Sequence, residues 1–400
     1  MELQEEITEA KFRDKEMFLH MGPSHPTMHG VIRLDLKLDG EKVVSSDVEI
    51  GYLHRCFEKM SEVVCWTLVL PYTDRLNYNS PIINNVGYVL AVEKLLQIQA
   101  PPRAQYLRVI TSELSRIGDH LTCIGALAMD LGAFTVLFWF IRVREFLWEL
   151  IEDICGARLT TSYTRVGGVA RDLPEGYAEK TRRALRELRD TMEKVEKLLN
   201  GNRIFLDRVK GTGIFSKEDA ISYSLTGPLL RAAGVEYDVR KAVPYCVYKD
   251  LDFDIPIGTV GDNYDRYLVR MEEMRQSARI VEQALVSIPE GPIIVDDPRV
   301  ALPKKEEVYG TIEGLMNHFK IVMEGIQVPS GEIYQLVEGA NGELGFYVVS
   351  DGSGRPYRIR VRPPCFFGIA ALPEMIQGSM IADIMPTFGN INMIAGELDR

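Results

Sequence analysis

Residues 22–41 read GPSHPTMHGVIRLDLKLDGE, and they combine a proline-rich loop with the first clear strand of the chain. From Ile32 to Leu38 every second residue is isoleucine or leucine, and charged residues occupy the positions between them. This period of two is typical of a strand that buries one face, and Asp39-Gly40 is a favourable hairpin turn. The sequence therefore predicts a small antiparallel sheet over residues 31–50.

The loop in front of this strand carries two of the six histidines, His25 and His29. Pro23 and Pro26 exclude a regular helix, so the two rings do not share one helix face. Rigid irregular loops often present side chains to a site, but a histidine in such a loop can also serve only to bind nearby backbone carbonyls. Both interpretations remain open on the residues alone.

The pattern changes to that of helices between residues 83 and 155. Apolar residues recur there at intervals of three and four, and Pro101-Pro102 separates the first helix from the second. Two further helices are predicted over residues 176–200 and 264–288. Together these segments predict a long central helical bundle.

The C-terminal part returns to strands. Residues 332–350 have the composition of a hairpin, with Asn341-Gly342 as its turn, and residues 357–362 form a further short strand that Pro363-Pro364 ends. The predicted fold class is therefore α+β, with a small N-terminal antiparallel sheet, the helical bundle and a C-terminal part of strands and helices.

The composition restricts the class of protein. The 400 residues carry a formal net charge of −11, which argues against binding to nucleic acid. The six cysteines form no C-x-x-C pair, so the usual signatures of zinc, iron–sulfur and thioredoxin-type sites are missing. No P-loop, G-x-S-x-G or H-E-x-x-H motif occurs either. The N-terminus shows no apolar signal segment, so we expect a location on the cytoplasmic side.

The most apolar run of the chain is AFTVLFWFI, residues 133–141. A membrane span needs about 20 apolar residues, and this run is much shorter. Arg142, Arg144 and Glu145 follow it directly. We expect a helix that is buried in the core of the protein.

Several strings of the sequence, in a fixed order, resemble the 49-kDa-type (D-type) subunit of respiratory NADH:quinone oxidoreductase, or complex I. They are GPSHPTMHGVIRLDLKLDGE, GYLHR, LPYTDRLNY, AVEKLL, PPRAQYLRVI, MDLGA, VGGV and MIAGELDR. The resemblance runs from about residue 19 to the C-terminus and implies the fold of the large subunit of nickel–iron hydrogenases. It suggests an N-terminal extension (1–18), a sheet with quinone-site loops (19–82), the helical bundle (83–325) and the C-terminal part (326–400).

Hydrogenase activity itself is excluded by the residues. Hydrogenases hold nickel and iron with two C-x-x-C pairs, one near each end of the chain. The N-terminal counterpart here, residues 55–59, has only Cys56, and the C-terminal counterpart, residues 396–400, has no cysteine. Four soft thiolates cannot be assembled, so we expect no metal site. We interpret Cys56 as a packed thiol.

The resemblance implies a quinone headgroup site in place of the metal. The family's headgroup ligands fall on His29 and Tyr78, and the carboxylate that accompanies the histidine falls on Asp130. A quinone carbonyl is only an acceptor, so hydrogen-bond donors are needed, and both side chains can also supply a proton. We expect these three residues to be catalytic.

Three further positions follow from the resemblance. Arg55 and Arg75 match family arginines close to the [4Fe–4S] cluster of the partner subunit, and positive charge there raises the cluster potential. Thr160 stands where the family commonly has a histidine that titrates with the redox state of the cluster. A threonine hydroxyl does not titrate at neutral pH, so we expect a cluster potential that hardly depends on pH.

The resemblance also implies the partners. The small iron–sulfur (B-type) subunit, the C-type subunit and the H-type subunit of the membrane arm are expected, with quinone as substrate, in a peripheral position on the cytoplasmic side of the inner cell membrane. Two alternatives remain: a related complex fed by ferredoxin or another donor, and a scaffold component of a membrane-bound hydrogenase relative without quinone chemistry. Retention of His29, Tyr78 and Asp130 favours the quinone-reducing complex over the scaffold.

Overall fold

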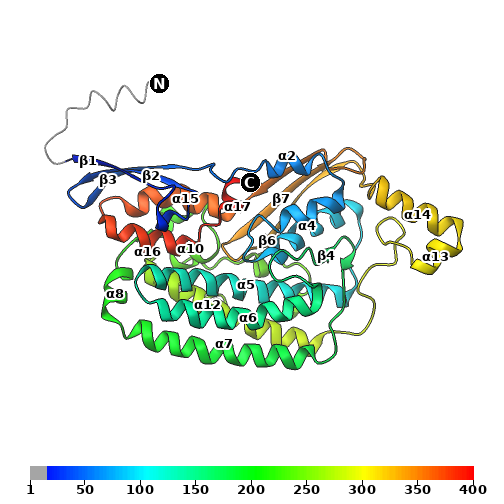
Figure 1. Cartoon of the computed structure of the whole chain (residues 1–400), viewed down its shortest axis with the longest axis horizontal. Helices are drawn as coiled ribbons and strands as arrows, with labels where there is room; N and C mark the ends of the chain where they lie inside the picture. Colours follow the sequence, from blue (N-terminus) through cyan, green and yellow to red (C-terminus); the bar gives the residue numbers. More distant parts are fainter. Residues whose placement is uncertain (1–15) are drawn as a thin grey trace, which may run out of the picture.

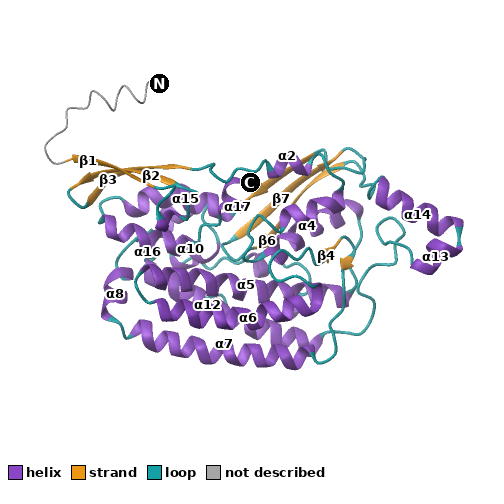
Figure 2. Ribbon diagram, in the orientation of Figure 1, coloured by secondary structure: helices purple, strands orange, loops and turns teal. Residues whose placement is uncertain are grey.

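The computed structural model describes residues 16–400, and Figures 1 and 2 show their arrangement. Helices form the body of this part of the chain, and three small antiparallel sheets lie around it. The predicted α+β class is confirmed. Of the predicted N-terminal extension, residues 1–15 lie outside the described residues. The other predicted domain boundaries stay predictions.

The N-terminal sheet lies at one end of the molecule, on the left in Figure 1, and has the strand order β1-β2-β3. Its strands are β1 (Glu16–Met21), β2 (Arg33–Asp39) and β3 (Lys42–Glu49). The alternation in β2 is that of a one-sided strand, since Leu34, Leu36 and Leu38 are buried. The predicted hairpin at Asp39-Gly40 is confirmed, whereas β1 was not predicted and begins before residue 19.

The central bundle is built around α5 (Pro102–Asp130), which is 29 residues long. The other long helices of the bundle are α4 (Pro81–Leu96), α6 (Phe134–Cys155), α7 (Tyr177–Asn200) and α12 (Asn263–Ser287). Helices α4, α6 and α12 pack on α5, and Figure 1 shows α5, α6, α7 and α12 running side by side. The predicted helices and the break at Pro101-Pro102 are confirmed.

Helix α6 corrects one expectation. The apolar run 133–141 does begin this helix, but it is not buried on all sides. Val136 and Phe140 face the core, whereas Phe134 and Phe138 are exposed. A helix that packs on one side only buries one stripe, so an apolar run need not be wholly internal.

Shorter elements connect the long helices. They are η1 (Pro26–Met28), α2 (Phe57–Ser61), η2 (Trp66–Val69), α3 (Leu70–Thr73), β4 (Thr164–Arg165), β5 (Gly168–Val169), α8 (Arg203–Val209), α9 (Lys217–Ser222), α10 (Gly227–Ala232), α11 (Val239–Ala242) and η3 (Tyr248–Asp250).

The C-terminal part forms a second three-stranded sheet with the order β6-β7-β8, which packs on α4. The predicted hairpin is confirmed, since Glu338 pairs with Glu343 on either side of Asn341-Gly342. The elements are β6 (Gly331–Glu338), β7 (Glu343–Ser350), β8 (Arg358–Arg362), α15 (Pro364–Ile376), α16 (Ile381–Ile391) and α17 (Ala395–Asp399). Helix α17 is buried, so the C-terminus is part of the core.

A helical pair, α13 (Lys305–Gly310) and α14 (Ile312–Met323), extends from the end of the molecule opposite the N-terminal sheet (Figure 1). Helix α14 carries an apolar face in water, formed by Ile312, Leu315, Met316, Phe319, Val322 and Met323. None of the helices in residues 16–400 combines the length and the apolar character that crossing a bilayer requires.

Candidate functional site

The loop of residues 22–30 exposes the His29 side chain, whereas the two residues before it are buried. His25 caps the short helix η1 through its Nδ1, which accepts a hydrogen bond from the Thr27 amide (3.3 Å). Thr27 and Met28 are buried, whereas His29 is exposed with a φ of 55°. Its ring packs edge-on against Phe388 of α16, with 5.7 Å between ring centroids. The two histidines therefore differ: His25 shapes the loop, and His29 is free to contact a ligand.

Asp130 ends α5 close to this histidine. Burial raises the pKa of the half-buried Asp130 carboxyl, and the charge of His29 acts in the opposite direction. The structure therefore brings the predicted pair into electrostatic contact. It forms no hydrogen bond between the two side chains within residues 16–400, so the expected ring–carboxylate bond stays a prediction.

Tyr78 lies in the loop between α3 and α4, and a buried carboxylate holds that loop. Asp119 Oδ2 in α5 accepts hydrogen bonds from Asn77 Nδ2 (2.8 Å) and Ser80 Oγ (2.9 Å), on either side of the tyrosine. The Tyr78 side chain is 37% exposed, and its hydroxyl makes no hydrogen bond within residues 16–400. A phenol that is fixed by its neighbours but has a free hydroxyl is well placed to donate to a ligand.

The predicted arginines meet beside this loop. Arg55 Nη2 donates to the backbone oxygen of Arg75 (2.8 Å), and Arg75 Nη1 donates to that of Pro71 (2.5 Å), so both side chains are anchored although both are exposed. Thr160 is partly buried in the loop after α6. That loop lies beside the arginines because the Ser162 amide donates to the Asp74 carboxylate (3.0 Å).

The C-terminal residues pack against residues 51–54 and against the loop that carries Arg75. The Asp399 carboxylate accepts hydrogen bonds from the amides of Gly51 (3.0 Å) and Leu53 (2.8 Å), and His54 Nδ1 donates to the Asp399 backbone oxygen (2.6 Å). Gly396 packs so tightly that a Cβ there would lie 2.3 Å from the backbone oxygen of Arg75. Residues 51–55 and the C-terminal residues 396–400 therefore lie side by side.

Cys56 corrects a second expectation, because it is not a packed thiol. It precedes α2 with a φ of 56°, and it is exposed, while the next residue, Phe57, is buried in its place. Its sulfur lies 3.5 Å from His54 Nε2. Among residues 16–400 no three His, Cys, Asp or Glu side chains are grouped as metal ligands would be.

A cluster of acids that the sequence did not reveal lies behind Tyr78. We call Tyr78, Asp119, Cys365 and Glu397 the acid cluster. Burial raises the pKa of the Tyr78 phenol, the charges of Asp119 and Cys365 raise it further, and Arg55 lowers it. Asp119 Oδ1 also accepts a hydrogen bond from Asn392 Nδ2 (2.8 Å), which links α5 to the segment before α17.

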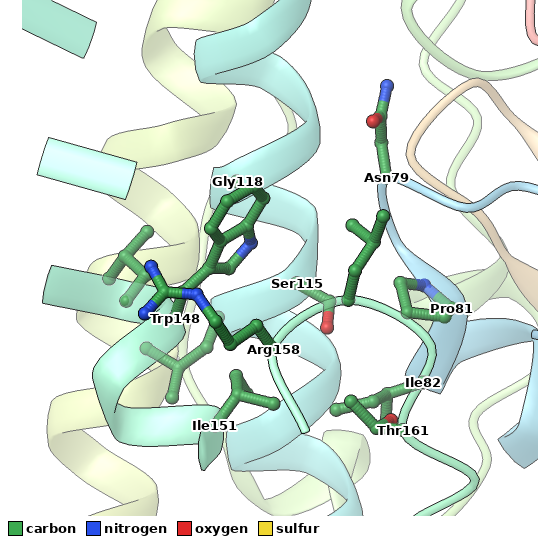
Figure 3. Close-up of a pocket in the computed structure, with 12 residues that line it drawn as sticks. Asn79, Pro81, Ile82, Ser115, Gly118, Trp148, Ile151, Arg158 and Thr161 are labelled. Atoms are coloured by element: carbon green, nitrogen blue, oxygen red, sulfur yellow. The ribbon is translucent and has the colours of Figure 1, made fainter. Parts of the chain in front are cut away.

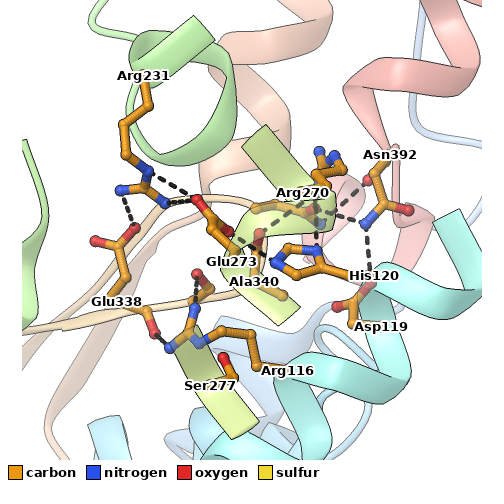
Figure 4. A network of polar contacts seen from close by, with 12 residues as sticks. Arg116, Asp119, His120, Arg231, Arg270, Glu273, Ser277, Glu338, Ala340 and Asn392 are labelled. Carbon is orange, nitrogen blue, oxygen red and sulfur yellow. Dashed lines mark hydrogen bonds and ion pairs between the residues drawn. The ribbon is translucent and has the colours of Figure 1, made fainter. Parts of the chain in front are cut away.

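Beyond the acid cluster lies a fully buried ionic network (Figure 4). His120 Nε2 donates to Glu273 Oε2 (2.8 Å), and Arg231 Nε donates to Glu273 Oε1 (2.8 Å). Arg270 Nη1 donates to His120 Nδ1 (3.3 Å) and to Asn341 Oδ1 (3.4 Å), and Asn341 Nδ2 donates to Cys365 Sγ (3.4 Å), which joins the network to the cluster. Burial lowers the pKa of His120, and its Nδ1 accepts a hydrogen bond from Arg270, which a neutral ring can do. The ionic network comprises Glu113, Arg116, His120, Arg231, Asp238, Arg240, Arg270, Glu273 and Glu338.

One signal in the sequence points to both groups of buried acids. Glu113, Arg116 and Asp119 follow one another at intervals of three in α5, among the core residues Leu114, Ile117 and Leu121. Charged residues at core positions are rare unless they are paired, so this pattern indicates a buried polar network. No comparable local signal marks Cys365 or Glu397, because Cys365 comes near Tyr78, and Glu397 near Cys365, only in the folded chain.

A narrow pocket lies next to the site, between α5, α6 and the loop before α7 (Figure 3). Asn79, Arg158 and Thr161 line it, so it adjoins both Tyr78 and Thr160 along the chain. Its volume is about 10 Å³, which is the space of one water molecule. Within residues 16–400 no hydrogen bond or ring contact joins His29 to Tyr78: Asp119 holds the Tyr78 loop, and Asp130, near His29, lies at the C-terminal end of the same helix.

The chain matches the family model described as "Respiratory-chain NADH dehydrogenase, 49 Kd subunit" over residues 130–400. This match places it among the subunits of respiratory oxidoreductases. It is 57% identical to the D-type subunit of NADH-quinone oxidoreductase from Myxococcus xanthus over 392 residues, which cover 98% of this chain and 94% of the relative. The chain belongs to the 49-kDa, or D-type, family of NADH-quinone oxidoreductase subunits.

Two further relatives extend this finding. A D-type subunit of NADH-quinone oxidoreductase from Sorangium cellulosum is 56% identical over 100% of this chain and 99% of the relative. A combined C/D-type subunit from Bdellovibrio bacteriovorus is 52% identical over 97% of this chain, but the match covers only 69% of that longer protein. The resemblance inferred from the sequence strings is confirmed over nearly the full length.

Proposed function

We propose that this chain forms the quinone headgroup site of its complex, and that His29 and Tyr78 donate hydrogen bonds and protons to the two quinone oxygens. The observation that carries the proposal is the position of Tyr78. Its loop lies against Gly396 and near Arg55, where the resemblance places the two segments that hold the metal in hydrogenases, and Cys56 is the one cysteine that these segments keep.

The residues suit the reduction of a quinone to a quinol. Two electrons and two protons must reach the ring, and the quinone oxygens can only accept hydrogen bonds. The free hydroxyl of Tyr78 supplies one donor, and the exposed ring of His29 supplies the other. Burial raises the pKa of the Asp130 carboxyl, and Asp130 lies close enough to His29 for the charge of the ring to lower it, so a carboxylate accompanies the proposed donor.

We infer that the electrons come from a [4Fe–4S] cluster held by the small iron–sulfur (B-type) subunit. Arg55 and Arg75 are exposed and anchored to backbone oxygens, so their charges are available to a neighbouring protein. A fixed positive charge close to a cluster stabilises its reduced form. Thr160 lies on the adjoining loop, and we assign it to the same contact.

The remaining partners are proposed on separate grounds. The name of the Bdellovibrio relative, which joins the C and D types, supports a C-type subunit as a neighbour. Phe134 and Phe138 are exposed just after Asp130, and this apolar surface suits a contact with the H-type subunit of the membrane arm near the entrance for quinone. The chain would then be a peripheral component on the cytoplasmic side of the inner membrane.

Replacement of Tyr78 by phenylalanine tests the proposal. The hydroxyl has no partner within residues 16–400, so Tyr78→Phe should cost about 1 kcal/mol of stability or less and leave assembly intact. Loss of a general acid lowers turnover about 100-fold or more. We expect that loss in quinone reduction, while NADH oxidation with an artificial acceptor that bypasses quinone stays normal.

Tyr357→Phe is the matched control, because Tyr357 is 65% exposed in the segment before β8. It should leave both activities unchanged. Normal quinone reduction by an assembled Tyr78→Phe complex would contradict the assignment of the headgroup site.

A further inference from the structure

Asp119 is a buried carboxylate that accepts hydrogen bonds from three neutral side chains. It lies in α5 and is 0% exposed. Its Oδ2 accepts from Asn77 Nδ2 (2.8 Å) and Ser80 Oγ (2.9 Å), and its Oδ1 accepts from Asn392 Nδ2 (2.8 Å). In the described part of the chain no lysine, arginine or histidine forms an ion pair with it. Buried carboxylates are usually paired with a cation, so this arrangement needs an explanation.

Two of these donors flank Tyr78. Asn77 and Ser80 lie on either side of the tyrosine in the loop between α3 and α4, and both are buried. Asn77 Oδ1 also accepts from the amides of Asn79 (3.1 Å) and Ser80 (3.4 Å), which closes the turn of this loop. The Tyr78 hydroxyl makes no hydrogen bond within the described residues. The position of the phenol therefore depends on the loop, which Asp119 binds on both sides of the tyrosine.

The third donor joins the tyrosine loop to the C-terminal part of the chain (Figure 4). Asn392 ends α16 with a φ of 56°, and its Nδ2 donates to Asn341 Oδ1 (2.6 Å) as well as to Asp119. Asn341 Nδ2 donates in return to the Asn392 backbone oxygen (3.1 Å). Gly396, four residues further on, packs against the loop, since a Cβ there would lie 2.7 Å from the backbone oxygen of Leu76. The Asp119 side chain therefore connects α5, the tyrosine loop and the segment before α17.

This arrangement requires an acceptor at both oxygens of residue 119. Three N–H or O–H groups point at two oxygen atoms, and a carboxylate can accept from all three. An asparagine would turn its own N–H toward Asn77 or Asn392, so that a donor would face a donor in a fully buried position. Hydrogen bonds to a carboxylate are also about twice as strong as those to a neutral acceptor. Asp119 therefore holds the loop more firmly than an amide could.

The charge of Asp119 also acts on the phenol that the loop carries. Burial raises the pKa of Tyr78, Asp119 in α5 and Cys365 in α15 raise it further, and Arg55 lowers it. A phenol whose pKa is raised keeps its proton more firmly before the reaction. The hydrogen bonds and the charge of Asp119 therefore act together, because they favour a phenol that is both fixed in place and protonated.

We propose that Asp119 is a positioning residue, which holds Tyr78 in the geometry for proton donation to the quinone through its bonds to Asn77 and Ser80. This inference rests on the proposed function of Tyr78. Asp119 takes no proton itself, because its two oxygens already accept from three donors. A displacement of about 1 Å can lower a reaction rate about 100-fold, so the loop need not unfold for the reaction to slow.

Asp119→Asn in the whole complex tests this role. The new side chain has the same size but presents a donor to Asn77 or Asn392. Turnover of quinone reduction per assembled complex should fall about 10- to 100-fold. NADH oxidation with an artificial acceptor that bypasses quinone should stay normal. Turnover equal to that of the unaltered complex would overturn the inference.

Asp262→Asn is the matched control, because it makes the same chemical change at another buried carboxylate. Asp262 caps α12 and accepts from the amides of Asp265 (2.8 Å) and Gly211 (2.9 Å). Within residues 16–400 it has no hydrogen bond to the tyrosine loop. Its turnover should stay within about twofold of that of the unaltered complex. A loss as large as that in Asp119→Asn would indicate a general effect of disturbed packing and would overturn the inference.

An exchange of two side chains tests whether the bond to the loop is what matters. Asn77→Asp combined with Asp119→Asn reverses the donor and the acceptor of the 2.8 Å bond between these residues. The amide in α5 can then donate to the carboxylate in the loop, and its oxygen can still accept from Asn392. Turnover should return to within about threefold of that of the unaltered complex. A double variant as slow as Asp119→Asn would overturn the inference.

The Tyr78→Phe background separates this inference from the proposed function. If Asp119 acts through the phenol, Asp119→Asn should lower the turnover of Tyr78→Phe by less than about twofold. A full further loss would overturn the inference and leave the role of Tyr78 intact, whereas normal turnover of Tyr78→Phe alone contradicts the proposed function. If Asp119→Asn does not assemble, Ser80→Ala decides the question, because it removes one donor to Asp119. Its turnover should fall, and an unchanged turnover would overturn the inference.

Discussion

Two polar regions, the ionic network and the acid cluster, lie next to each other along α5. Their carboxylates have different partners. In the ionic network, Glu113 contacts Arg116 and Arg240, and Glu273 contacts Arg231. In the acid cluster, Asp119 and Glu397 receive hydrogen bonds from amides, a hydroxyl and a backbone N–H. Glu113, Glu273, Asp119 and Glu397 are all buried, so the difference between these carboxyls lies in the charge of their partners.

The ionisation of the carboxyls follows from this difference. Burial acts to raise the pKa of Glu113, but Arg116 and Arg240 outweigh it and the pKa is lowered. Burial also raises the pKa of Glu397, and nothing of comparable strength opposes it. Acids paired with arginine remain ionised and hold the helices together, whereas an unpaired acid can exchange a proton at neutral pH.

Glu338 belongs to the ionic network, but its pKa is raised like that of Glu397 in the acid cluster. Burial and the neighbouring Asp238 raise the pKa of Glu338 to about 7, although Arg231 Nη1 donates to it (2.9 Å). Three carboxylates share that arginine, because Asp238 lies 3.6 Å from the same nitrogen and Glu273 lies 2.6 Å from Arg231 Nη2. The number of arginines per carboxylate therefore decides the ionisation.

The largest effect should come from removing an arginine of the ionic network. Arg231→Met leaves Glu273 and Glu338 without this partner in a fully buried position. Breaking a buried ion pair from one side costs about 3–5 kcal/mol. We expect a lower unfolding temperature and a smaller amount of assembled complex. Arg203→Met, an exposed change in α8, is the control and should shift stability by less than about 0.5 kcal/mol.

The second largest effect should come from a change at His29, which should lower the turnover of quinone reduction and leave assembly intact. His29→Ala removes the proposed donor to quinone and should lower quinone reduction about 100-fold. His25→Ala removes only the bond from the Thr27 amide, so a loss of about 1 kcal/mol in the stability of the loop and a few-fold loss of turnover are expected. Steady-state kinetics of both assembled variants measure the difference. Equal losses would mean that the loop matters as a scaffold and His29 is no ligand.

The smallest effect should be on the redox potential of the neighbouring cluster. Thr160 cannot titrate, so the potential of the partner's [4Fe–4S] cluster should be nearly constant between pH 6 and 8. Thr160→His adds a titratable ring and should introduce a slope of up to about 60 mV per pH unit. Redox titrations followed by EPR measure both slopes. A slope of that size in the unaltered complex would show that another group carries the proton.

The sequence predicted the parts of the fold that depend on local patterns. The alternation in β2 and the turn at Asp39-Gly40 are local, and so are the helical period and the prolines that bound α5. Strand β1 was not predicted because Met17 and Phe18 are both exposed, so its residues do not alternate clearly. The run 133–141 was expected inside the core, since composition alone does not show which face of a helix packs.

The candidate site was less predictable from the sequence than the fold was. His29, Tyr78 and Asp130 were identified only through the resemblance to a family, because nothing in their spacing shows that they are neighbours. Glu397 was not identified as part of the site at all. The neighbouring Gly396 contacts the tyrosine loop, and Glu397 contacts the Cys365 amide. Both contacts join segments that are far apart in the sequence, so they depend on the tertiary fold.

The exposed apolar face of α14 has a practical consequence for anyone who prepares this protein. Six apolar side chains on a projecting helix remain in contact with water when the chain is alone, and such surfaces promote self-association. A chain expressed by itself should therefore precipitate as its concentration rises, even when it has folded correctly. Coexpression with the other genes of its complex, or a mild detergent during purification, should improve the yield of dispersed material.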